Sequence, residues 1–219
     1  MTKETQSVFT WKLELQITLY SLKLLFKELG LINLCLLSCH MVLLQLQGEP
    51  FRTFPKASAK GDIFSRKQIG PAIVLYKALR KLYSEERALQ ISEIIIIDST
   101  LIFLRQAVGA INRQRIEAMT EPQRQTWLSE IAEQFLNATI RWNRIGLSDL
   151  SFTITHCYFP KMCADSGVPE LGPIFCKGDA VYFGTEQEGV SLNRPHTIAL
   201  GSNDCLFEME LVQLKTKPD

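Results

Sequence analysis

The sequence lacks the features that mark several large classes of protein. Its 24 basic and 23 acidic side chains almost balance, so the formal net charge is only +1. A chain without a basic surplus has no electrostatic footprint for nucleic acid, and we expect no nucleic-acid partner. Six cysteines in 219 residues are too few for a disulfide scaffold. The sequence also has no CxxC pair, no P-loop, no dinucleotide fingerprint and no GxSxG motif, which removes the best-known signals for zinc ribbons, nucleotide binding and serine hydrolysis.

A secretory signal is also missing from the first residues. Residues 2–7 read Thr-Lys-Glu-Thr-Gln-Ser, which is polar and offers neither an apolar segment nor a small-residue cleavage site. We therefore expect a cytoplasmic protein whose cysteines are free thiols.

One long apolar run argues against a simple soluble chain. Residues 29–47 carry no formal charge and are rich in leucine, with Leu29 and Leu46 near the two ends. A spanning helix needs about 20 apolar residues, and here Asn33, Ser38 and His40 interrupt the run. We expect residues 29–46 to be buried in the protein or against a partner, which could be a second copy of the chain. Membrane contact remains the alternative.

The pattern of apolar residues predicts a single α+β domain over residues 1–219. Hydrophobic helices occupy residues 1–50, and a linker rich in Pro, Gly and basic residues follows over 51–70. Residues 71–146 are expected to be helical, with Pro71 in a first helical turn, the isoleucine run 94–97 in a buried helix, and Thr120 as a cap.

The spacing of apolar residues changes after Gly146. Residues 152–158 alternate as in a strand, and further strands are expected at 180–184, 190–192, 197–200 and 205–214. The cysteine-rich part, residues 147–214, is therefore expected to form the sheet. The predicted architecture is an N-terminal helical layer packed on a C-terminal antiparallel sheet.

Three cysteines lie at the edges of these predicted strands: Cys157, Cys176 and Cys205. They are compatible with three interpretations. They could be buried core thiols. They could be three ligands of one tetrahedral zinc or iron site completed by a His or Asp. One of them could be a nucleophile, in which case no cofactor is expected.

A nucleophilic thiol needs a base or a cation beside it. His156 is adjacent to Cys157, but neighbours on a strand point to opposite faces. His196 and Asp179 are therefore better candidates as partners of Cys157, although Asp179 could equally be a turn residue.

Arg194 is the candidate for binding a substrate carboxylate. A guanidinium can hold a carboxylate with two parallel hydrogen bonds. The alternative is a simple surface pair with Glu186 or Glu188.

The order of short motifs in this region resembles the L-2-amino-thiazoline-4-carboxylic acid hydrolase family. The motifs are Cys157, Gly167-Val168-Pro169-Glu170-Leu171, Phe175-Cys176-Lys177-Gly178-Asp179, Arg194 with Thr197, Gly201, and Asp204-Cys205-Leu206-Phe207. The family tends to have aspartate directly after the last cysteine, where this chain has Leu206. The resemblance spans roughly residues 70–212, and the specific motifs lie within 152–210.

The resemblance implies a hydrolase that opens the ring of a small carboxylate-bearing substrate at a C–N bond of a cyclic amidine or thiazoline. It implies Cys157 or Cys176 as nucleophile, Asp179 as the anchor for the amidine, and His196 or His156 as base. Arg194 would bind the carboxylate, and Thr197 lies within the same motif.

Other functions fit the same pattern. A non-catalytic small-ligand-binding module or a metal or thiol sensor would also combine apolar helices with clustered cysteines. A metal-dependent enzyme using Cys157, Cys176 and Cys205 is a further alternative. Thiol reactivity distinguishes them, because a catalytic thiol reacts quickly and a structural or metal-bound thiol slowly.

Overall fold

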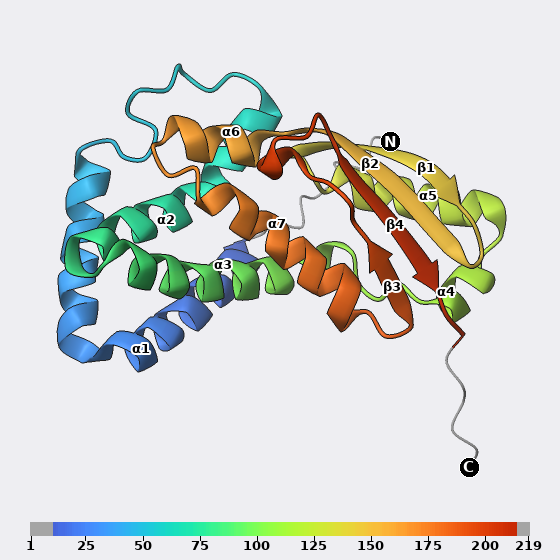
Figure 1. The fold of residues 1–219 in the computed structure, drawn as a ribbon, viewed down its shortest axis with the longest axis horizontal. Helices are drawn as coiled ribbons and strands as arrows, with labels where there is room; N and C mark the ends of the chain where they lie inside the picture. The colour runs from blue at the N-terminus through green and yellow to red at the C-terminus, as the bar shows by residue number, and fades with distance from the viewer. Residues whose placement is uncertain (1–10, 214–219) are drawn as a thin grey trace, which may run out of the picture.

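The computed structural model describes residues 11–213 and confirms the α+β architecture. Helices from the first half of the chain lie side by side at one end of the molecule, and an antiparallel sheet forms the other end (Figure 1). The sheet has the strand order β1-β2-β4-β3. Its strands are β1 (Ala138–Ile145), β2 (Asp149–Cys157), β3 (Val190–Asn193) and β4 (Cys205–Leu211).

Helix α1 (Trp11–Leu46) is bent in the middle. Gly30 lies inside it with φ 72° and ψ 174°, a conformation that only glycine adopts without strain. Two limbs therefore diverge from this residue, as the blue ribbon in Figure 1 shows.

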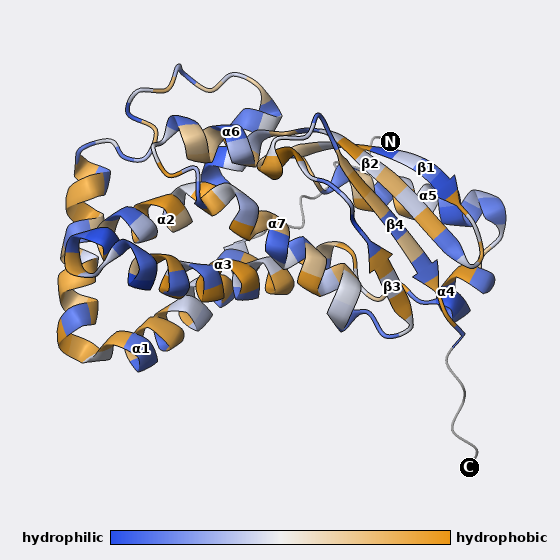
Figure 2. Ribbon diagram, in the orientation of Figure 1, coloured by the Kyte–Doolittle hydropathy of each residue, from blue (hydrophilic) through white to orange (hydrophobic). Residues whose placement is uncertain are grey.

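The apolar surface of α1 is mostly exposed, which corrects the expectation that residues 29–46 are buried in the protein's own core. In its most apolar 18-residue window only 11% of the residues are buried, and Leu31, Ile32 and Leu46 are 65%, 78% and 80% exposed. Figure 2 shows apolar residues along both limbs. By length and composition alone, α1 could cross a membrane.

Helices α2 (Lys60–Leu82) and α3 (Glu85–Ala107) pack against α1. The start of α2 at Lys60 shows that the predicted linker over 51–70 was too long, and it places Pro71 inside the helix, where a proline removes only one backbone hydrogen bond. The run Ile94–Ile97 lies in α3, as predicted, because period-3.6 burial of Ile91 and Ile95 continues through it.

The region after Thr120 differs from the prediction. Thr120 is the N-cap of helix α5 (Glu121–Glu133), as predicted, and its N–H donates to Gln123 Oε1 at 2.8 Å. The prediction of helix up to residue 146 was wrong, because β1 starts at Ala138 and pairs with β2 over its whole length. The spacing of Ile140 and Trp142 alone fits either a helix or a strand. The segment forms a strand because β2, which follows directly in sequence, pairs with it as a hairpin partner.

The connection between the sheet strands is also more helical than predicted. Helices α6 (Tyr158–Asp165) and α7 (Leu171–Val181) follow β2, and a π-helical turn, Tyr182–Glu186, extends α7. The predicted strand at 180–184 is therefore wrong, and so is the one at 197–200, where a 3-10 turn, Ile198–Leu200, forms. Tyr182 stabilises the helical conformation of this segment, since its hydroxyl donates to Gly109 O at 2.6 Å.

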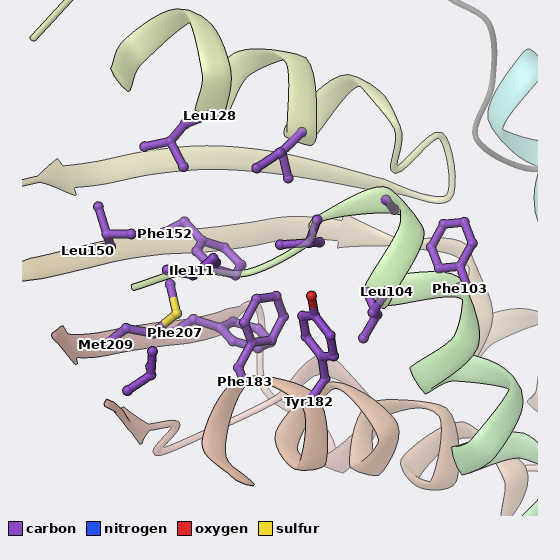
Figure 3. Close-up of a cluster of buried hydrophobic side chains, with 14 of the residues drawn as sticks. Phe103, Leu104, Ile111, Leu128, Leu150, Phe152, Tyr182, Phe183, Phe207 and Met209 are labelled. Atoms are coloured by element: carbon purple, nitrogen blue, oxygen red, sulfur yellow. The ribbon is translucent and has the colours of Figure 1, made fainter. Parts of the chain in front are cut away.

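The inner face of the sheet packs on these helices through a cluster of aromatic rings (Figure 3). The rings of Phe152 on β2 and Phe207 on β4 stack with centroids 4.5 Å apart. Phe183, from the π-helical turn, meets both rings edge-on. This cluster fixes the position of α7 relative to β2 and β4.

Helix α7 also approaches α3 closely, because Gly178 has no side chain. A Cβ atom at Gly178 would lie 2.7 Å from Cβ and Cγ2 of Thr100 on α3. The short residue is therefore required by the contact between the two helices, and the next residue, Asp179, is held in a fixed position.

We predict that Gly178→Ala destabilises the protein by about 1 to 3 kcal/mol, the usual cost of overpacking. Urea unfolding would measure this change. Gly184→Ala is the matched control, because its Cβ would meet Leu192 at an ordinary 3.5 Å. Equal stability of the two variants would contradict the tight α3–α7 contact.

Candidate active site

A cavity of about 550 Å³ lies between the inner face of the sheet and the helices. Most of its lining is apolar. On the side of α7, β2 and β4 the residues with reactive or charged side chains that line it are Cys157, Cys176, Asp179, Arg194 and Cys205. On α1 and α2 the charged residues Glu14 and Lys67 also line it, and they form an ion pair with each other. An apolar cavity with a few convergent polar groups is the usual form of a small-molecule site.

A β-bulge in β2 brings Cys157 into this cavity. Thr139 pairs with His156 while its neighbour Ile140 pairs with Ile154, so the strand contains one extra residue at this point. The extra residue reverses the alternation of faces. Cys157 therefore lines the cavity together with Ile154, and His156 is exposed. This corrects the sequence expectation, which placed His156 with Ile154 and Cys157 on the opposite face.

Helix α7 supplies two of the other groups. Cys176 and Asp179 are three residues apart, so they lie on one face of the helix. Phe183 follows four residues after Asp179 and continues this face into the aromatic cluster. Asp179 is thus a helical residue facing a cavity, and the turn interpretation is wrong.

Asp179 has an unusual environment for a carboxylate. Burial raises its pKa to about 6, and the positive charge of Arg194 offsets this rise only in part. Within residues 11–213 its carboxylate has neither an ion-pair partner nor a hydrogen-bond donor. Asp179 is half-buried, and a carboxylate that has lost much of its hydration is normally paired, so this group retains its capacity to bind a ligand.

Arg194 is held at the other side of the same polar region. Its Nη1 donates to the carbonyl oxygen of Cys176 at 2.6 Å, and its guanidinium lies over the ring of Phe207, 4.6 Å from the centroid. The buried Nε of Arg194 has no hydrogen-bond partner within the described chain. Arg194 pairs with neither Glu186 nor Glu188 there, and Glu186 pairs with Arg105.

The cavity thiols are protonated at neutral pH. Burial raises the pKa of Cys157 to about 12, although the backbone N–H of Phe159 partly offsets this rise. Burial and then the charge of Asp179 raise the pKa of Cys176 to about 12, against the opposing effect of Arg194. Burial also raises the pKa of Cys205, whose sulfur accepts the Ile198 N–H at 3.2 Å.

The structure does not bring the two candidate histidines to the cavity. His196 Nε2 lies 2.6 Å from Asp204 Oδ1, and these side chains are 37% and 42% exposed. His156 lies outside, with its ring edge-on to Tyr158 at 4.7 Å. Thr197 is buried but does not line the cavity. Neither histidine is placed to act as base for a cavity thiol.

The alternative of a metal site formed by Cys157, Cys176 and Cys205 is not supported by the arrangement. In residues 11–213, no three His, Cys, Asp or Glu side chains gather closely enough to hold a metal ion. The three cysteines come from β2, α7 and β4, and they line the cavity without converging on one point.

Sequence reasoning missed several polar residues of the cavity, among them Asn137 and Trp142. Both line it, and the Asn137 Oδ1 and Trp142 Nε1 atoms are buried without a protein partner. They lie just before and within β1, a stretch that was expected to be helical. The turn at Gly146 was the sequence signal that could have identified Trp142, because it indicates a hairpin of β1 and β2.

Comparison with family models matches residues 65–209 to the model described as L-2-amino-thiazoline-4-carboxylic acid hydrolase. The matched segment contains α3, α7, the first three strands and most of β4, and therefore Cys157, Cys176, Asp179, Arg194 and Cys205. Comparisons with curated proteins and with solved structures gave no match.

We predict that Asp179→Asn stabilises the protein at pH 8. The folded-state pKa of about 6 exceeds the ordinary value near 4, so the folded state binds the proton more tightly. The stability of the wild type relative to the variant should fall as the pH rises from about 4 to 6, and then stay constant. The full difference is at most about 3 kcal/mol, since one pKa unit corresponds to 1.36 kcal/mol.

Urea unfolding at pH 4.5, 6 and 8 would measure this dependence. Asp204→Asn is the control, because Asp204 is 42% exposed beside His196 and lies outside the cavity. A wild type that gains stability relative to Asp179→Asn on going from pH 4.5 to 8 would contradict an unpaired, half-buried Asp179 carboxylate.

Proposed function

The chain belongs to the L-2-amino-thiazoline-4-carboxylic acid hydrolase family, and from this premise we propose that it opens the ring of a cyclic amidine or thiazoline. The substrate would also carry a carboxylate. Hydrolysis would occur at the ring carbon that lies between two heteroatoms, at its C–N bond, with a cysteine of the cavity as nucleophile.

The observation that carries this proposal is the pair of unsatisfied, opposite charges in one apolar cavity. The carboxylate of Asp179 has no partner in the described chain, and Arg194 has a free buried Nε. A protonated amidine and a carboxylate on one small ring would complement them. In a cavity of low dielectric constant such charge pairs are stronger than in water.

Cys157 is the nucleophile that we favour. It occupies the N-cap of α6, where the first backbone N–H groups and the helix dipole favour a negative charge. The Phe159 N–H already lowers the pKa of this thiol against the effect of burial. Cys176 has its carbonyl bound to Arg194, and we assign it to the wall of the site.

Binding of the substrate would activate the thiol. A protonated amidine held by Asp179 puts a positive charge beside Cys157, and an adjacent positive charge lowers the pKa of a thiol. Asp179 is not itself needed as a strong base, since its pKa of about 6 suits a group that exchanges one proton near neutral pH. This arrangement would replace the histidine base that the cavity lacks within the described residues.

The reaction balances with one water molecule and no other reactant. Asp179 takes the thiol proton of Cys157 as the sulfur adds to the ring carbon; the C–N bond of the ring then breaks, and its nitrogen takes that proton from Asp179. Water adds to the same carbon and gives a proton to Asp179. The carbon–Cys157 bond breaks, the sulfur of Cys157 takes the proton back from Asp179, and the proton of the new hydroxyl group passes to the released amine, so that the product keeps its sulfur and gains a carbonyl group and an amine.

A specific observation also favours the non-catalytic alternative. Thiols with a pKa of about 12 react slowly, as those of a ligand-binding module would. The two functions differ in what a ligand does to Cys157: a substrate accelerates its modification or is turned over, whereas a simple ligand only shields it.

We predict that Cys157→Ala lowers the turnover of 2-amino-thiazoline-4-carboxylate by about a thousandfold or more, the scale seen when a nucleophile is removed. Cys176→Ala should lower it far less. Cys39→Ala is the control, since Cys39 is an exposed thiol on α1. Equal losses in Cys157→Ala and Cys176→Ala would contradict our assignment of the nucleophile.

Product analysis tests the bond that is broken. Opening at the C–N bond yields a new primary amine and no new thiol, which amine- and thiol-specific reagents distinguish. A product with a free thiol would show cleavage at the C–S bond and overturn this part of the proposal. No turnover, together with ligand-induced shielding of Cys157, would favour the binding module.

A further inference from the structure

The cavity is larger than a single five-membered ring with one carboxylate requires. Its volume of about 550 Å³ lies in the middle of the range for drug-sized ligands, about 300 to 1,000 Å³. The thiols and the unpaired charges occupy only the part near α7, β2 and β4, since Glu14 on α1 and Lys67 on α2 pair with each other. The remaining space must be explained by another part of a ligand.

The remaining lining is mostly apolar, with the ion pair of Glu14 and Lys67 and a few uncharged polar side chains in it, and it leads toward α1. Phe159 and Phe175, whose ring centroids are 5.3 Å apart, follow and precede the two thiols Cys157 and Cys176 in sequence and belong to the helical core cluster. Beyond them the lining comes from α1, α2 and α3, with Ile95 as an example on α3.

Both limbs of α1 line this apolar part of the cavity. Leu25 from the first limb and Leu37 from the second are buried lining residues. Thr18, Leu22 and Ser38 also line it and are exposed, so the cavity reaches the surface between the limbs. The bend at Gly30 therefore shapes an apolar passage from the surface to the charged groups.

Helix α1 lies outside residues 65–209, the segment that matches the family model. The groups that would bind the ring and its carboxylate all come from the matched segment. Much of the wall of the apolar passage comes from a part of the chain beyond it. A ligand that uses the whole cavity thus has a polar head, as the family name implies, and a second part particular to this chain.

We infer that the ligand of this protein is an amphipathic acid, with a small charged head at Asp179 and Arg194 and an unbranched apolar tail that runs past Phe159 and Phe175 to α1. The inference rests on the proposed function for the identity of the head. The tail follows from the lining, which is mostly apolar and whose charged members on this side, Glu14 and Lys67, already pair with each other. A charged chain would lose its hydration there without gaining a free partner.

The test is a calorimetric titration of the full chain with straight-chain carboxylates from acetate to decanoate at pH 7.5. The affinity should increase by about threefold to fourfold for each added methylene, the factor expected when one methylene is buried. An affinity that stays constant from butanoate onward would overturn the inferred tail site.

Two matched variants locate the tail. Leu22→Asp puts a charge at the cavity opening and should weaken decanoate binding at least threefold without changing acetate binding. Leu19→Asp is the control: both leucines lie on the first limb and are 48% and 56% exposed, but Leu19 does not line the cavity. Both are surface changes that leave the core intact. Equal effects of the two variants would overturn the assigned path.

The same titration separates this inference from the proposed function. If the protein turns over the thiazoline but binds all straight-chain carboxylates with the same affinity, the tail site is overturned and the hydrolase proposal stands. If the affinity rises with the chain length of the carboxylate but no thiazoline is turned over, the amphipathic ligand is supported and the hydrolase proposal is overturned. Arg194→Gln should weaken all members of the series by the same factor, and an effect restricted to the long acids would contradict the orientation of the head.

Discussion

The close contact of α7 with α3 is the constraint on which the candidate site depends. Gly178 allows the two helices to approach at Thr100, and the aromatic cluster around Phe183 holds the end of α7 against the sheet. Between these two fixed points, Asp179 has one position available, facing the cavity. A carboxylate without a partner is costly to bury, so it is kept there by the packing of the helix and not by its own interactions.

The cavity contains few charged side chains, and these determine which chemistry it can support. Asp179 and Arg194 face a mostly apolar space, and both retain hydrogen-bonding capacity. The other two charged lining residues, Glu14 and Lys67, pair with each other. The thiols beside Asp179 and Arg194 are neutral because burial raises their pKa. An adjacent positive charge lowers the pKa of a thiol, so the protonation of these thiols depends on what the cavity holds.

Helix α1 contributes both to the cavity and to the outer surface of the protein. Its inner face completes the cavity, while most of its remaining surface is apolar and exposed. One helix thus combines the wall of a ligand passage with an apolar outer surface. The bend at Gly30 makes this possible, because a straight helix could not contribute both of its halves to the rim of one cavity.

The sequence by itself determined the fold class, the helix over the isoleucine run, the last strand, and the residues of the polar region: Cys157, Cys176, Asp179 and Arg194. These follow from apolar periodicity and from the types of residue that can carry such chemistry. Only the tertiary structure decided how they meet. A one-residue bulge, set by pairing with β1, exchanged the faces of His156 and Cys157, and the packing of α7 turned an expected strand into helix. Periodicity describes local geometry, whereas strand register and helix contact depend on residues far away in the sequence, and for that reason the sequence could not assign His196 to Asp204 or Asp179 to the cavity.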